Sequence, residues 1–138
     1  MMRKTAEGLV IGIVIWIAGA LIIILLGQSP YFPLAALPSA FLAAPLMYGV
    51  TRFHLRGVPV AERTTTATIL GMTVAAVQFP LDALGWFIIT NLGYPPLSQV
   101  ARDAGVLGLL IGYFWLLVMP YWTASAIARS TGKAKVGK

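Results

Sequence analysis

The chain has 138 residues, of which 59% are hydrophobic and only 10% are charged, and its net charge is +6. Soluble domains average about 45–50% apolar and about 25% charged residues, so this chain lacks the charge that covers a globular surface. The composition therefore excludes an ordinary soluble domain, a disordered chain and a nucleic-acid-binding module. It indicates an integral membrane protein whose first partner is the lipid bilayer.

Four apolar runs are long enough to form membrane-spanning helices, each of which needs about 20 mostly apolar residues. They cover about residues 8–26, 31–50, 65–89 and 105–128. Transmembrane barrel strands would instead show shorter segments of alternating polarity. The sequence therefore predicts an all-α fold, an integral membrane bundle of four transmembrane helices in a single domain over residues 1–138.

The connections between the runs are short and carry turn residues. Residues 27–30 predict a tight turn, and residues 51–64 a polar, basic loop. Pro95 and Pro96 prevent a continuous helix in the third connection, after which residues 97–104 predict a short interfacial helix capped by Ser98. Residues 130–138 are rich in glycine and lysine and predict a flexible basic tail.

The positive charges predict the orientation in the membrane. Nine of the ten Lys and Arg residues fall on one side of an up-and-down bundle, and only Arg102 falls on the other. Because positive charge is retained in the cytoplasm, both termini are expected there, in a multi-pass protein of the bacterial inner (plasma) membrane. The nine residues are Arg3, Lys4, Arg52, Arg56, Arg63, Arg129, Lys133, Lys135 and Lys138.

Several short segments resemble an uncharacterised family of small bacterial four-helix membrane proteins, defined by a domain of unknown function. The resemblance covers nearly the whole chain. It implies the four-helix membrane architecture and no particular activity. The segments are Gly12-Ile13-Val14-Ile15-Trp16-Ile17, Leu26-Gly27-Gln28, Pro80-Leu81-Asp82-Ala83-Leu84, Tyr94-Pro95-Pro96-Leu97-Ser98, Asp103-Ala104-Gly105-Val106-Leu107 and Gly112-Tyr113.

Asp82 is the one ionisable residue inside a predicted span. A charge near the centre of a bilayer costs at least about 2.5–3.5 kcal/mol on insertion scales, so such residues usually face the bundle interior. Three interpretations of Asp82 remain open. It is a hydrogen-bonded packing residue, an ion- or proton-binding group, or a side chain in a water-filled vestibule.

Residues at a similar depth are the candidate partners of Asp82. Gln78 lies one turn away on the same helix face. With a rise of about 1.5 Å per residue, Tyr113 and Ser39 lie about 12–13 Å below the outer ends of their helices, against about 10 Å for Asp82. We therefore predict a substrate- or ion-binding site of Asp82, Gln78, Tyr113 and Ser39. Trp16 and Trp115 also lie deep in their spans and are candidates for pocket walls.

Other polar and small residues have simpler interpretations. Glu7 is interpreted as an acid in the first turn of a helix, and His54 as an interfacial residue near anionic lipid headgroups. Gly8-x-x-x-Gly12 and Gly108-x-x-x-Gly112 match the small-residue pattern of close helix packing, within the bundle or in a dimer.

The functional prediction is a small transporter or channel for a small solute or ion, acting as a homo-oligomer, with Asp82 as its intramembrane polar site. The alternative is a non-catalytic accessory or assembly subunit of a larger membrane complex. No enzyme is expected, because one buried carboxylate has no catalytic partner of known type. The chain has no cysteine and a single histidine, so no metal site is expected. No cofactor is expected either, and the composition argues against a nucleic-acid partner.

Overall fold

The computed structural model describes the backbone of residues 2–136, but the side chains of residues 2, 3, 35, 37, 39 and 131–136 lie outside the described part. Within this range the chain is all-α. Two of the helical segments are short, a 3-10 turn η1 and a π-helical turn η2. The elements in chain order are α1 (Met2–Leu26), α2 (Phe32–Phe41), α3 (Ala43–His54), η1 (Val60–Glu62), α4 (Arg63–Phe87), η2 (Ile88–Leu92) and α5 (Gln99–Val136).

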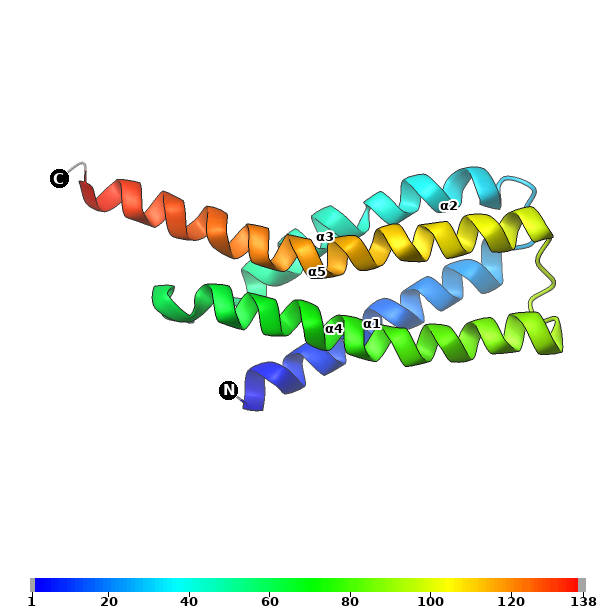
Figure 1. Ribbon diagram of the computed structural model, residues 1–138, viewed down its shortest axis with the longest axis horizontal. Coiled ribbons are helices and arrows are strands. Elements are labelled where there is room, and N and C mark those ends of the chain that lie inside the picture. The colour runs from blue at the N-terminus through cyan, green and yellow to red at the C-terminus, as the bar shows by residue number, and fades with distance from the viewer. Residues whose placement is uncertain (1, 137–138) are drawn as a thin grey trace.

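The helices form an elongated up-and-down bundle (Figure 1). α1 and α4 run in one direction, and the α2–α3 segment and α5 return in the other. α1 packs mainly on α4, whereas α5 packs on α2, α3 and α4. We call the end where α1 starts and α5 finishes the terminal end. The opposite end, which holds the connections around residues 27–31 and 93–98, is the turn end.

Three helical stretches are long and apolar enough to cross a membrane: Lys4–Leu26, Val60–Leu92 and Gln99–Ser130. This confirms the prediction of an all-α chain with long apolar helices for three of the four expected spans. The expected span over residues 31–50 differs, because the structure divides this stretch between two helices of 10 and 12 residues.

The break between α2 and α3 has a local cause in Pro45. A proline lacks the N–H that would bond the carbonyl four residues earlier, and its ring clashes with that carbonyl. For Pro45 this carbonyl belongs to Phe41, the last residue of α2. Leu42 nevertheless keeps right-handed helical angles, with φ of −65° and ψ of −18°, so the chain continues in the same direction after the break. Together α2 and α3 still return from the turn end toward the terminal end (Figure 1).

The last helix is longer than the sequence predicts. Ser98 acts as its N-cap, since the Ser98 Oγ accepts a hydrogen bond of 3.2 Å from the Ala101 N–H. The helix expected at residues 97–104 is therefore the first part of α5 and not a separate interfacial element. α5 continues through Pro120 to Val136. The flexibility predicted for residues 130–138 stays a prediction, because the side chains beyond Ser130 and the last two residues lie outside the described part.

Buried apolar side chains form three clusters along the bundle. The cluster at the turn end joins α2, η2 and the start of α5, and the middle cluster joins α3, α4 and α5. The third cluster, at the terminal end, joins the α3–η1 loop to α4 and α5. The clusters consist of Phe32, Ala36, Ile89, Leu97 and Ala101; of Met47, Leu70, Val74 and Leu116; and of Leu55, Val58, Ala67 and Ala124.

Two glycines allow helices to approach each other closely. A Cβ atom at Gly12 of α1 would lie 3.0 Å from the Cβ of Val77 in α4. A Cβ atom at Gly71 of α4 would lie 2.8 Å from the backbone oxygen of Leu116 in α5. The glycine pattern of the first apolar run therefore serves packing within the bundle, which brings the backbone of α1 within reach of polar side chains on α4.

Candidate functional site

Asp82 joins three helices in the half of the bundle nearer the turn end. The Tyr113 hydroxyl of α5 donates a hydrogen bond of 2.7 Å to Oδ2 of Asp82 in α4. The indole of Trp16 in α1 lies near the same carboxyl group. Asp82 is partly buried and thus faces the seam between α1, α4 and α5. The structure therefore brings together Asp82, Tyr113 and one of the two deep tryptophans.

Gln78 lies beside this group but bonds elsewhere. Its side chain is 6% exposed, and its Nε2 donates a hydrogen bond of 3.0 Å to the backbone oxygen of Gly12. The close approach at Gly12 places this carbonyl within reach of the Gln78 amide. Because α1 and α4 run in the same direction, Gln78 meets Gly12 and Asp82 meets Trp16 one turn further along both helices. The two contacts thus form a polar seam between α1 and α4.

Ser39, the fourth predicted site residue, belongs to α2, but its side chain is outside the described residues. The described part of the site therefore draws its side chains from α1, α4 and α5.

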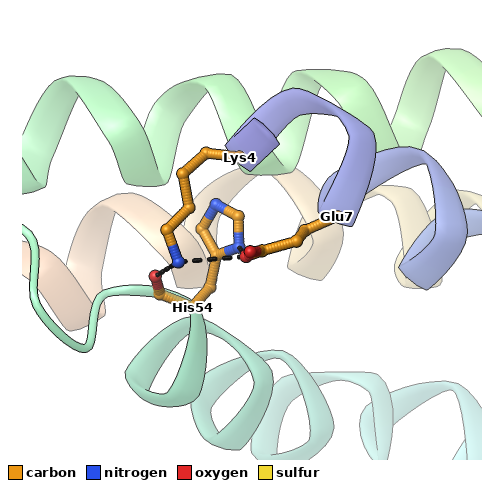
Figure 2. A network of polar contacts seen from close by, with 3 residues as sticks. All are labelled: Lys4, Glu7 and His54. Atoms are coloured by element: carbon orange, nitrogen blue, oxygen red, sulfur yellow. Dashed lines mark hydrogen bonds and ion pairs between the residues drawn. The ribbon is translucent and has the colours of Figure 1, made fainter. Parts of the chain in front are cut away.

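A second polar cluster lies at the terminal end (Figure 2). Lys4 of α1 donates hydrogen bonds to Oε2 of Glu7, at 3.0 Å, and to the backbone oxygen of His54, at 2.8 Å. His54 is the last residue of α3 and is 2% exposed, although its sequence neighbours Arg52 and Arg56 are exposed. The sequence suggests an interfacial residue near lipid headgroups, whereas the structure buries the His54 side chain beside α1. No signal along the chain indicates this contact, since Lys4 and Glu7 lie about fifty residues before His54.

The ring of His54 does not have a full set of hydrogen bonds. Its Nδ1 lies 3.2 Å from Oε2 of Glu7, but it makes no well-aligned hydrogen bond. The buried hydroxyl of Thr51, one turn earlier on α3, also finds no hydrogen-bond partner among the described residues. Burial lowers the pKa of His54 from its ordinary value of 6.5, and the charge of Lys4 lowers it further, while Glu7 opposes the shift. His54 lies beyond the span predicted over residues 31–50.

The lowered pKa of His54 predicts how stability depends on pH. Below about pH 6.5 the unfolded chain takes up a proton on His54 more readily than the folded chain, so the free energy of unfolding should fall as the pH falls. Thermal unfolding in detergent micelles at about pH 8 and about pH 5.5 would measure this change. His54→Gln, in a chain with no other histidine, should reduce the difference between the two pH values. Greater stability of the wild type at the lower pH would contradict this account.

The chemistry available in the two clusters is proton or cation binding. Asp82 and Tyr113 place a carboxyl group and a hydroxyl in contact inside an apolar bundle, and Glu7 and His54 place a carboxylate beside an imidazole. Among the described residues, no group of three or more His, Cys, Asp or Glu side chains could hold a metal ion.

Comparison with protein families, with curated proteins and with solved structures finds no match to this chain. The resemblance to a family of small four-helix membrane proteins therefore stays a prediction.

Proposed function

We propose that the chain is a four-pass protein of the bacterial inner membrane with both termini in the cytoplasm. Three membrane-length helices and the broken α2–α3 segment support four crossings. The start of α1 and the end of α5 share one end of the bundle (Figure 1), as an even number of crossings requires. Most of the basic residues belong to segments at this end, which therefore faces the cytoplasm by the positive-inside rule.

We further propose that the protein is a small transporter or channel for an ion or small solute, with Asp82 as its intramembrane binding group. The observation that carries this proposal is the hydrogen bond from Tyr113 of α5 to Asp82 of α4, near Trp16 of α1. Ionisable residues within spans generally face the bundle interior, pair with other groups and mark ion or proton pathways. Asp82 faces the interior and pairs with Tyr113, so it meets the first two of these conditions. The third, a place on an ion or proton pathway, is what we propose.

A homo-oligomer is part of this proposal. Four helices packed around apolar clusters leave little space for a pore inside one copy. α1 packs mainly on α4, and within its membrane-length stretch Lys4–Leu26 only Gly8 and Gly12 are buried. A second copy beside α1 would bring two Asp82 groups into one assembly and would line the path between them.

The test is the collapse of an imposed pH gradient across vesicles that contain the purified full chain. A trapped pH-sensitive dye reports the rate. We expect faster collapse than in protein-free vesicles of the same lipid. If vesicles with the protein and protein-free vesicles showed the same rates under proton, sodium and potassium gradients, a transport function would be contradicted.

An accessory or assembly subunit is the second candidate, and the exposed α1 supports it as well. In this role α1 would pack against a helix of another membrane protein, and Asp82 with Tyr113 would hold α4 and α5 together. The two candidates differ in the vesicle test, because an accessory subunit alone should transport nothing. Neither candidate includes a catalytic activity.

A further inference from the structure

An open pocket at the terminal end lies away from Asp82. It has a volume of about 290 Å³ and is formed by the end of α3, the loop that follows, the first residue of α4 and one residue of α5. Half of its lining residues are arginines. The lining residues are Arg52, Leu55, Arg56, Gly57, Arg63 and Ile127.

Each of the three guanidinium groups is held in place by a neighbouring group. The Nε of Arg63 donates a hydrogen bond of 3.0 Å to the backbone oxygen of Val58. Arg52 bonds the hydroxyl of Tyr48 at 3.1 Å. Arg56 stacks over the ring of Phe53, with its Cζ 5.1 Å from the ring centroid. Since a guanidinium has five N–H donors, most donors of each arginine stay available to a ligand.

Among the described residues, no ion pair joins a carboxylate to Arg52, Arg56 or Arg63. The ion pairs between described residues include those of Glu7 with Lys4 and His54, away from the pocket. Three positive charges around one small open pocket favour an anion. Arginine is also the residue best suited to phosphate, because its planar donors match the phosphate oxygens in pairs.

The surroundings of the pocket favour a phosphate that is attached to a lipid. Phe53, on which Arg56 stacks, is 64% exposed, and Val60, three residues before Arg63, is 50% exposed. Ile127 adds an apolar wall. A charged pocket bordered by exposed apolar side chains matches the boundary between headgroups and acyl chains. Basic pockets between helices on the cytoplasmic side of a membrane bind anionic headgroups in this way.

We propose that the pocket of Arg52, Arg56 and Arg63 binds the phosphate group of an anionic phospholipid. The headgroup phosphate lies among the guanidinium groups, and the acyl chains lie along the apolar residues beside them. The bound lipid links α3, α4 and α5 at the terminal end. This site is independent of Asp82 and holds for either candidate function.

The test measures binding of phosphatidylglycerol, phosphatidylcholine and inorganic phosphate to the purified full chain in neutral detergent, by native mass spectrometry. We expect phosphatidylglycerol to bind more tightly than phosphatidylcholine. Since a basic residue near the membrane surface contributes about 1 kcal/mol, Arg56→Gln and Arg63→Gln should each weaken binding roughly fivefold, and the double variant roughly 25-fold. Arg63→Lys keeps the positive charge but not the paired N–H donors, so it should weaken binding less than Arg63→Gln does.

Two arginines outside the pocket provide matched controls. The Nε of Arg102 donates to the backbone oxygen of Leu97, five residues earlier, as Arg63 does to Val58, but Arg102 lies in the first turns of α5 near the turn end. Arg129 shares the terminal end but does not line the pocket. Arg102→Gln and Arg129→Gln should bind phosphatidylglycerol as the wild type does. The helical circular dichroism of every variant must match that of the wild type.

Three results would overturn the proposal. The first is undiminished phosphatidylglycerol binding in the double variant. The second is an equal loss in Arg129→Gln, which would indicate a general effect of surface charge. The third is retention of inorganic phosphate, but not of phosphatidylglycerol, with the same dependence on Arg56 and Arg63, which would assign the pocket to a free phosphate ion.

Discussion

Replacing Asp82 by asparagine should reduce proton-driven flux in vesicles at least tenfold, to the rate of protein-free vesicles. Asparagine has nearly the same shape and still accepts the Tyr113 hydrogen bond, so packing between α4 and α5 should be kept. It cannot bind and release a proton, however, and it carries no charge to attract a cation. The rate of pH-gradient collapse, measured with a trapped dye, reports the change.

Asp103→Asn is the matched control, because Asp103 is the only other aspartate and is exposed in the first turns of α5. It should leave the flux unchanged. Tyr113→Phe removes the donor to Asp82 and should change the flux less than Asp82→Asn does. Full flux in Asp82→Asn would remove Asp82 from the transport path and with it the main reason for ranking transport above an accessory role.

The Gly71→Val substitution should have the largest effect on folding. A Cβ atom at this position would lie 2.8 Å from the Leu116 oxygen and 3.2 Å from Cγ of Pro120, and neither the backbone nor the proline ring can move aside easily. Overpacking of this kind costs about 1–3 kcal/mol for small additions, and the two methyl groups of valine add to the clash. α4 and α5 should therefore separate, which would be measured as lower resistance to unfolding by SDS in mixed micelles.

Gly85→Val on the same helix is the control, since a Cβ atom there has no neighbour within 4 Å. It should unfold at nearly the wild-type SDS concentration. Gly71→Ala adds a smaller side chain, so its SDS concentration of unfolding should lie between those of Gly71→Val and the wild type. Equal stability of Gly71→Val and Gly85→Val would mean that α4 and α5 do not approach closely at Gly71.

The helices that could be predicted from the sequence are those with long, uninterrupted apolar runs. Apolar length alone identifies α1, α4 and most of α5. It does not identify the break at Leu42, because the expected span over residues 31–50 is uncharged throughout and a proline can either kink a helix or divide it. α5 starts at Gln99, six residues before the span predicted from residue 105, because the polar residues after Ser98 resemble a separate interfacial helix.

The sequence predicts how deep each candidate site residue lies along the bundle. It does not predict the direction in which each side chain points around its helix axis. The rise per residue places Asp82 and Tyr113 at similar heights, and the structure joins them. The same arithmetic groups Gln78 with Asp82, yet the Gln78 amide bonds the backbone of Gly12, because Gly12 allows α1 to approach α4 closely. The contact of Glu7 with His54 depends on how α3 meets α1, which apolar periodicity does not specify.

The central claim is that the chain crosses the membrane four times, with Asp82 inside the bilayer and both termini in the cytoplasm. Because the chain has no cysteine, single cysteines can be introduced without a prior substitution. Gln28, Ala61 and Ser130 are exposed positions in the turn after α1, in η1 and near the end of α5. Each would be replaced by cysteine and treated in intact cells with a membrane-impermeant maleimide.

The Ala61 position decides whether the broken α2–α3 segment crosses the membrane. Four crossings predict labelling of Gln28→Cys in intact cells, and labelling of Ala61→Cys and Ser130→Cys only after the cells are opened. If α2 and α3 stayed on the outer side, three crossings would remain, and Ala61→Cys and Ser130→Cys would both react from outside. Labelling of these two positions in intact cells would therefore contradict the account.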